Sequence, residues 1–126
     1  MTESQLSYLR GSVHGNVLVV TILVEKIGDP DTSYALRDEI LLLFNGSKTS
    51  HIVLDLQRVT FICSVGFLAF LSLRRYLDDG QIVICNSAES VRDMFEVFRL
   101  ASQDPSVTAP FQVEDTLEAA LARFSE

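Results

Sequence analysis

The chain of 126 residues has the length of one ordinary domain, and its 48% hydrophobic and 21% charged residues are typical of a globular protein with a packed core rather than a disordered or fibrous chain. Ten Lys and Arg residues stand against seventeen Asp and Glu residues, and the net charge of −7 excludes a broad nucleic-acid-binding surface because a phosphate backbone would be repelled. We expect a single domain that spans residues 1–126 and has no nucleic-acid partner.

The N-terminus and the cysteine content indicate the cellular compartment. Residues 1–10 have neither the basic opening nor the apolar run of a secretory signal. Two cysteines, Cys63 and Cys85, do not make a disulfide framework. The longest apolar stretches, such as residues 67–71, are far shorter than the roughly 20 residues that a membrane-spanning helix needs. We therefore predict a cytoplasmic protein that does not insert into a membrane.

The N-terminal third of the chain predicts a hairpin followed by a helix. Residues 7–24 alternate and then become continuously apolar around a turn at residues 14–16, so the second strand should be the more buried. Asp29 and Pro30 combine a capping residue with a strand breaker. Apolar residues then recur at helical spacing from Leu36 to Phe44, and Asn45 and Gly46 are expected to end this helix.

The rest of the chain alternates between strand and helix patterns. Two short β-branched runs, residues 51–56 and 81–85, are typical of strands buried on both faces of a sheet. The other predicted elements are a helix over 65–77, a helix capped by Asn86 and Ser87 that runs to about Leu100, an irregular stretch over 101–110, an edge strand over 111–113 and a short helix over 116–124.

This order of elements predicts an α/β fold. An opening hairpin followed by alternating strands and helices favours a mixed sheet whose later strands are parallel, with helices that cover the sheet. In such folds functional groups gather where strands end and helices begin. Cys63 and Ser64 lie at such a junction, between an apolar strand and an apolar helix.

The residues around Cys63 and Ser64 do not favour an enzyme. A nucleophile needs a base within hydrogen-bond reach, but His14 is placed in the hairpin turn and His51 at the far end of the sheet. Gly66 is a single glycine without a nearby lysine, unlike a phosphate-binding loop. The cysteines and histidines do not show metal-ligand spacing. We predict no catalytic residue, no cofactor and no metal, and a reducing compartment disfavours a disulfide between Cys63 and Cys85.

The predicted helix after Ser64 has two apolar faces rather than one. Serine before an apolar helical run is a preferred N-cap residue, which is a sufficient structural role for Ser64. Phe70, Leu73 and Leu77 share one face with Gly66, and a second stripe contains Phe67, Leu68 and Leu71. The second stripe is either buried against neighbouring helices or available to a partner. We expect Phe67 to be exposed.

The sequence resembles the STAS domain, the fold of bacterial anti-sigma factor antagonists. The family pattern is an apolar strand ending in Asp-Leu, a short loop, and Asp-Ser-Ser or Asp-Ser-Thr followed by Gly at the start of a helix. The run HIVLDL, Ser64 and Gly66 match this pattern. Upstream, Asp29, Thr32 and Leu36 match the family spacing before its first helix. The resemblance covers essentially the whole chain.

The resemblance implies a regulatory protein that binds an anti-sigma factor, typically a serine kinase, and is controlled by phosphorylation. It makes Ser64 the expected phosphorylation site and assigns partner binding to Asp29, Cys63, Ser64, Gly66 and Phe67. The chain departs from the family where Cys63 replaces the aspartate, Val65 replaces the second hydroxyl residue and Lys26 replaces a glycine.

Two alternatives to this reading remain. The first is a STAS scaffold or ligand-sensing module that is not phosphorylated, which predicts an apolar cavity or a buried Ser64. The second is an enzyme that uses Cys63 or Ser64, which predicts a deep pocket with a base beside them. We favour a phosphorylation-dependent antagonist whose choice of partner is altered by Cys63.

Overall fold

A computed structural model of the protein describes residues 3–5, 8–98, 101–102 and 109–124. The strands, in chain order, are β1 (Glu3–Gln5), β2 (Leu9–His14), β3 (Val17–Ile22), β4 (Lys26–Ile27), β5 (His51–Asp55), β6 (Phe61–Ile62), β7 (Ile82–Cys85), β8 (Ala101–Ser102) and β9 (Phe111–Glu114). The helices are α1 (Pro30–Ser47), α2 (Ser64–Ser72), the 3-10 helix η1 (Leu73–Tyr76), α3 (Glu89–Val97) and α4 (Leu117–Ala122).

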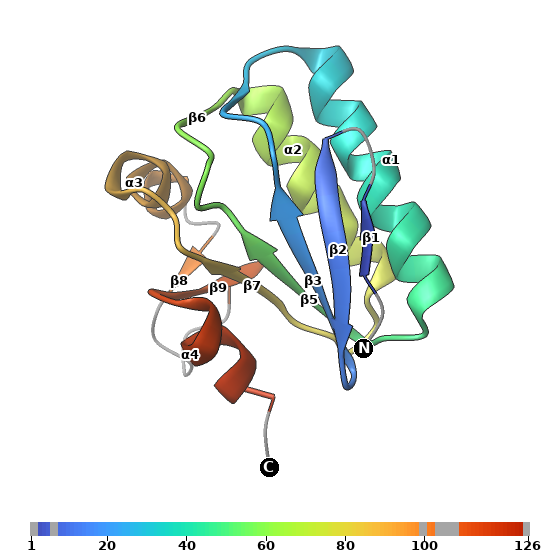
Figure 1. The fold of residues 1–126 in the computed structure, drawn as a ribbon. Coiled ribbons are helices and arrows are strands. Elements are labelled where there is room, and N and C mark those ends of the chain that lie inside the picture. The colour runs from blue at the N-terminus through green and yellow to red at the C-terminus, as the bar shows by residue number, and fades with distance from the viewer. Residues whose placement is uncertain (1–2, 6–7, 99–100, 103–108, 125–126) are drawn as a thin grey trace.

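Within these described residues, the main sheet has seven strands in the order β1-β2-β3-β5-β7-β9-β8 (Figure 1). The first three strands are antiparallel, and the pairs β3–β5, β5–β7, β7–β9 and β8–β9 are parallel. The predicted α/β fold, with an opening hairpin and later parallel strands, is therefore confirmed.

The hairpin forms where the sequence predicts it. Gly15 supplies the positive φ of 60° that the tight turn between β2 and β3 requires. Strand β3 is almost wholly buried and β2 only in part, as expected. Strand β1 pairs with β2 as an additional edge strand that the sequence pattern did not indicate.

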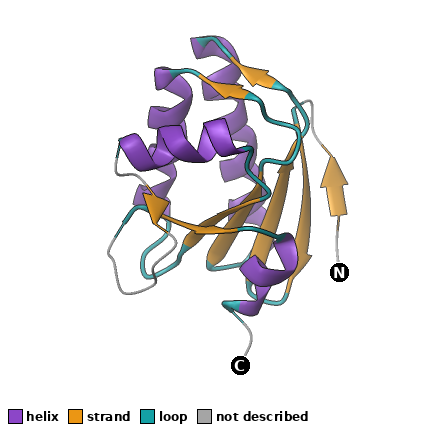
Figure 2. Cartoon of the chain, turned by 90° about the vertical axis from the view of Figure 1, so that its left-hand side faces the viewer, coloured by secondary structure: helices purple, strands orange, loops and turns teal. Residues whose placement is uncertain are grey.

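The two faces of the sheet have separate cores. One core contains Leu18, Val20, Leu54 and Ile84 and is covered by α1, α2 and α3. The other core contains Val19, Val53, Val83 and Cys85 and packs against Ala120 of α4. Neighbouring strand residues alternate between these cores because side chains along a strand point to opposite faces. Figure 2 shows α4, the short C-terminal helix, on the side of the sheet opposite to the longer helices.

Helix α1 begins as predicted but ends later. Asp29 is its N-cap residue, and the carboxylate accepts a hydrogen bond of 3.0 Å from the Thr32 amide. The helix continues through the predicted stop at Asn45 and Gly46 to Ser47, and its C-cap residue Lys48 has a left-handed φ of 58°. A left-handed residue can end a helix without being glycine, at some conformational cost.

The later elements agree with prediction in type and differ at their ends. The helix expected over 65–77 is divided into α2 and η1, and α3 begins after Ala88 instead of after Ser87. The predicted end of α3 at Leu100 lies outside the described residues. Within the stretch expected to be irregular, residues 101–102 form β8, so β9 is a strand as predicted but is not the edge of the sheet.

A second, two-stranded sheet positions the region around Ser64. Strands β4 and β6 pair in parallel, with Lys26 opposite Phe61 and Ile27 opposite Ile62. Each strand has only two residues, which is too short for an alternating sequence pattern to predict it. The pairing places the segment that enters α1 beside the segment that enters α2.

Candidate functional site

The N-terminal ends of α1 and α2 meet where β4 and β6 end. The Cys63 amide donates a hydrogen bond of 2.8 Å to the Ile27 carbonyl oxygen, which continues the pairing one residue beyond β6. Asp29 follows two residues after Ile27, and Ser64 follows Cys63. The predicted site residues Asp29, Cys63 and Ser64 are thus brought to one edge of the fold.

Ser64 is exposed and is the first residue of α2. The predicted N-cap role for Ser64 is wrong, because Cys63 has the extended backbone of the N-cap residue, with φ −78° and ψ 169°. The bond from Cys63 to Ile27 keeps Cys63 in strand-like geometry, so the helix starts one residue later than serine preference suggests. The Cys63 side chain makes no capping hydrogen bond. The Ser64 hydroxyl is therefore at the surface, on the first turn of a helix.

Cys63 contacts α1 through a serine that the sequence analysis did not single out. Its Sγ lies 3.8 Å from Oγ of Ser33, which is 1% exposed. The Ser33 hydroxyl in turn donates a hydrogen bond of 2.8 Å to the Asp29 carbonyl oxygen. Ser33 therefore joins the N-cap residues of both helices. Only the pairing of β4 with β6 could have indicated this role.

Gly66 allows α2 to approach the small sheet closely. A Cβ atom at this position would lie 2.7 Å from Cγ2 of Ile62 and 3.0 Å from Cγ2 of Ile27. These separations are shorter than carbon–carbon contact distances, so a larger residue would force the helix away. Gly66 is buried and fixes the position of the first turn of α2.

Phe67 is buried, and the expectation that it is exposed is wrong. Its side chain is 3% exposed and packs edge-on against Phe95, with the ring centroids 4.7 Å apart, and against Phe98 at 5.8 Å. Helix α3 covers this part of α2. The apolar pattern of α2 alone could not show which neighbouring element would bury Phe67. The exposed apolar side chains near Ser64 are Leu68, at 63%, and Phe61, at 44%.

Asp29 remains a charged neighbour of the Ser64 region. Its carboxylate is exposed, and hydrogen bonds from the Thr32 backbone amide and side chain lower its pKa below the usual 3.8. Asp29 is thus an anion at neutral pH, and the positive end of the α1 dipole stabilises it further.

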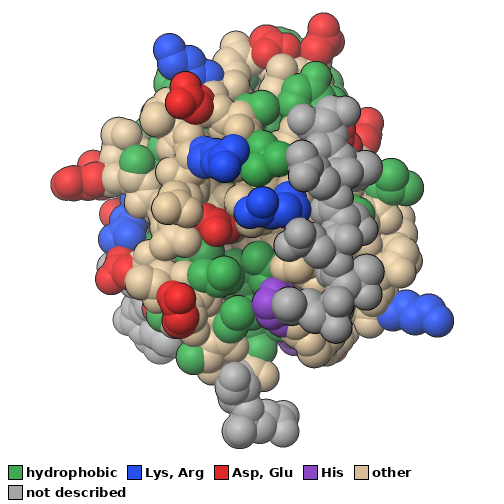
Figure 3. Space-filling model, viewed as in Figure 1, with side chains coloured by type: hydrophobic (Ala, Val, Ile, Leu, Met, Phe, Trp, Pro, Cys, Tyr) green, Lys and Arg blue, Asp and Glu red, His purple; other side chains and the backbone are tan. Residues whose placement is uncertain are grey.

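The two histidines lie at the opposite end of the sheet from Cys63, as predicted for His51, and His14 is the last residue of β2 before the hairpin turn. His51 Nδ1 accepts a hydrogen bond of 3.0 Å from the Gln81 amide, and the ring stacks on Phe124 with 4.4 Å between centroids. Together with His14, these residues line an open hollow of about 640 Å³ that neither Cys63 nor Ser64 lines. Figure 3 shows hydrophobic side chains beside a histidine on this face. Neither histidine is placed to act as a base for Ser64.

The cysteines are free and lie apart. Burial, followed by the charges of Asp55 and Glu118, raises the pKa of Cys85 to about 12. Cys85 packs under α4, whereas Cys63 contacts α1 on the other face of the sheet. In the part of the chain that the structure describes, no group of three His, Cys, Asp or Glu side chains could hold a metal ion. No described helix is long and apolar enough to span a membrane.

The chain is similar to a known protein family and to solved structures. The family model of the STAS domain matches residues 12–120. The structure of the anti-sigma factor antagonist SpoIIAA in its unphosphorylated form matches with a TM-score of 0.65 and 19% identity, over 92% of this chain and 96% of that chain. The Bacillus cell fate determinant SpoIIAA in the phosphorylated form matches with a TM-score of 0.66 and 20% identity, over 93% of this chain and 99% of that chain. No curated protein sequence gives a significant match.

Proposed function

Because this chain belongs to the STAS domain family, a family of non-enzymatic regulatory proteins, we propose that it is a single-domain, cytoplasmic anti-sigma factor antagonist. Its partner is an anti-sigma factor that is also a serine kinase, and phosphorylation at Ser64 prevents the two proteins from forming a complex. The observation that carries the proposal is the position of Ser64, exposed on the first turn of α2 beside the exposed apolar residues Phe61 and Leu68.

The position of Ser64 suits a phosphorylation switch. An exposed hydroxyl is accessible to a kinase, and the free amides at a helix N-terminus favour an added phosphate. A phosphoserine carries a charge of about −1.5 to −2, which disfavours a partner surface built around apolar residues. The folded chain can therefore accept the phosphate while its complex cannot. The structurally similar SpoIIAA is known in an unphosphorylated and a phosphorylated form, which supports a phosphorylated state for this chain.

The other partner-binding residues proposed from the sequence take different roles in this arrangement. Asp29 is exposed and can contact the partner directly, and half-buried Cys63 can do so in part. Gly66 and Phe67 are buried and do not contact the partner. They hold α2 in position, Gly66 against the small sheet and Phe67 against α3. Leu68 and Phe61, rather than Phe67, make the direct apolar contact with the partner.

The alternative of a STAS scaffold without phosphorylation keeps the docking surface and removes the switch. Cys63 in place of the family aspartate is the feature that favours it. Exposed Ser64 argues against the version in which that serine is buried. The two functions differ in one measurable property, the transfer of phosphate to Ser64.

The test is to incubate the protein with purified anti-sigma factor kinases and ATP, and to locate phosphate by mass spectrometry. We expect phosphate on Ser64 and loss of complex formation in Ser64→Asp. Ser72→Ala is the matched control, because Ser72 is also on α2 but its hydroxyl donates a hydrogen bond of 2.6 Å to the Ala69 carbonyl oxygen. Complex formation without phosphate transfer would favour the scaffold, and no complex with any kinase would defeat the proposal.

A further inference from the structure

The chain segment that carries Ser64 contains no acidic residue. Residues 56–77 contain no Asp or Glu, although the whole chain has seventeen, and they include Arg58, Arg74 and Arg75. The exposed residues of this segment are Gln57, Arg58, Thr60, Phe61, Ser64, Leu68, Arg75 and Tyr76. Its surface is therefore apolar, neutral or cationic within a protein whose net charge is −7.

Three of these exposed residues lie along one side of α2 and η1. Ser64 and Leu68 are one helical turn apart, and Leu71 and Arg75 continue the same side at the next turns. Leu68 is 63% exposed, Leu71 is half-buried and Arg75 is exposed. We call Ser64, Leu68 and Arg75 the α2 strip. It has an apolar centre with the proposed phosphorylation site at one end and a cation at the other.

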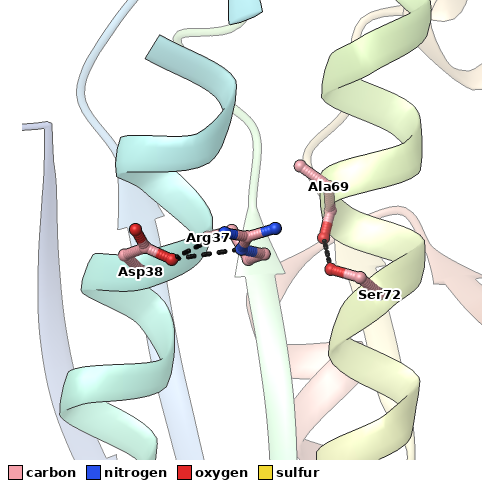
Figure 4. Close-up of polar contacts among 4 residues, drawn as sticks. All are labelled: Arg37, Asp38, Ala69 and Ser72. Carbon is pink, nitrogen blue, oxygen red and sulfur yellow. Dashed lines mark hydrogen bonds and ion pairs between the residues drawn. The ribbon is translucent and has the colours of Figure 1, made fainter. Parts of the chain in front are cut away.

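A second cation, Arg37, lies on α1 next to α2. Figure 4 shows the Arg37 side chain extending from α1 towards α2, where Ala69 and Ser72 lie. Arg37 donates hydrogen bonds of 3.1 and 3.0 Å to one oxygen of Asp38, and its guanidinium carbon lies 5.0 Å from the centre of the Tyr34 ring. Asp38 is highly exposed, so this ion pair is weak and a carboxylate from a partner can compete for Arg37.

We propose that the partner lays an acidic, amphipathic segment along the α2 strip, with an apolar side chain against Leu68 and carboxylates against Arg37 and Arg75. This inference rests on the proposed function and specifies the chemistry of the partner. The choice of an acidic occupant follows from charge complementarity, because residues 56–77 carry arginines and no carboxylate, with Arg37 of α1 next to α2, whereas the chain as a whole has a net charge of −7. On the opposite face, acidic side chains are scattered among Lys and Arg side chains (Figure 3).

The same arrangement gives a physical reason for the switch. A phosphate on Ser64 would lie one turn from Leu68, within the path of the acidic segment. Like charges would then meet at an interface that depends on opposite charges. Dissociation would follow from repulsion, without any change in the fold.

Charge reversal tests the inference with the anti-sigma factor kinase that binds in the experiment above. Arg75→Glu and Arg37→Glu are each expected to raise the dissociation constant about tenfold, and rising salt should weaken the wild-type complex. Arg10→Glu is the control. Leu9 and Gly11 beside Arg10 are buried towards α1, so Arg10 points to the opposite face of the sheet, and its reversal should leave binding unchanged. Unchanged or tighter binding in the Arg75 and Arg37 variants would overturn the inference and leave the proposed function intact.

A second measurement tests the apolar centre and the other possible occupant. Leu68→Ala should weaken binding, whereas Leu42→Ala, at a residue of α1 that is 65% exposed, should not. Analytical ultracentrifugation of the chain alone should give a monomer. A dimer that Leu68→Ala dissociates would show that a second copy of this chain covers the strip and would overturn the inference. Failure of every kinase to bind would instead defeat the proposed function on which it rests.

Discussion

The sulfur of Cys63 lies 3.8 Å from the hydroxyl oxygen of Ser33, across the junction between α2 and α1. Ser33 is 1% exposed and also bonds to the Asp29 carbonyl oxygen, so the residue before Ser64 is held by the first turn of another helix. The presentation of Ser64 therefore depends on contacts made by residues more than thirty positions earlier in the chain.

Replacing Cys63 by aspartate should stabilise the fold. Cys63 is the N-cap residue of α2 and makes no capping hydrogen bond, whereas an aspartate there can accept one from the first turn. We expect the free energy of unfolding of Cys63→Asp to increase by about 1 kcal/mol, measured by urea denaturation. Cys63→Ser should give part of the gain without the charge. A less stable Cys63→Asp variant would show that the contact with Ser33 excludes a capping side chain.

Replacing Gly66 by alanine should destabilise the fold. The added methyl group would lie 2.7 Å from Ile62 Cγ2, and such overpacking typically costs about 1–3 kcal/mol, more than alanine returns in helix propensity. Gly46→Ala is the matched control, because Gly46 is also helical and a Cβ atom there meets nothing within 4 Å. That variant should gain up to about 1 kcal/mol in a parallel urea titration. Equal effects at both positions would contradict the close packing of α2.

The sequence predicted the sheet and its helices because each long element has its own periodic pattern. Helix α1, for example, is specified by the Asp29 cap and by apolar residues at helical spacing. The site was predicted less well, because its geometry depends on contacts between elements. The pairing of β4 with β6 involves two residues on each strand, and it moves the N-cap position of α2 from Ser64 to Cys63. Likewise, Phe67 is buried because Phe95 of α3 packs against it, a contact between two separate helices.

Phe67 and Leu68 should respond in opposite ways to truncation. Phe67→Ala removes a buried ring that contacts Phe95 and Phe98, and such changes typically cost about 3–5 kcal/mol. Leu68→Ala removes an exposed side chain, so the free energy of unfolding should change by less than about 0.5 kcal/mol. Thermal unfolding followed by circular dichroism measures both. A large loss of stability in Leu68→Ala would remove it as a probe of partner binding.

The stability that Asp29 contributes should depend on pH. Hydrogen bonds from Thr32 lower the pKa of Asp29 in the folded state below 3.8, so its contribution is complete above that value and is lost as pH falls through the folded pKa. Asp29→Asn keeps an N-cap side chain but has no carboxylate. Its unfolding temperature, compared with that of the wild type between about pH 2 and 5, should lack this acid-dependent component. Identical pH profiles would show that the capping bond to Thr32 does not persist in solution.

The two thiols should differ sharply in reactivity. Burial and the nearby charges of Asp55 and Glu118 raise the pKa of Cys85 to about 12, so almost no thiolate is present at pH 8. Cys63 is only half-buried. Iodoacetamide at pH 8 should therefore modify Cys63 in the folded protein and Cys85 only when denaturant is added, as mass spectrometry of the peptides would show. Cys63→Ser provides the control, since it should remain unmodified under native conditions. Rapid labelling of Cys85 in that variant would mean that α4 leaves the sheet readily and that this face of the fold opens in solution.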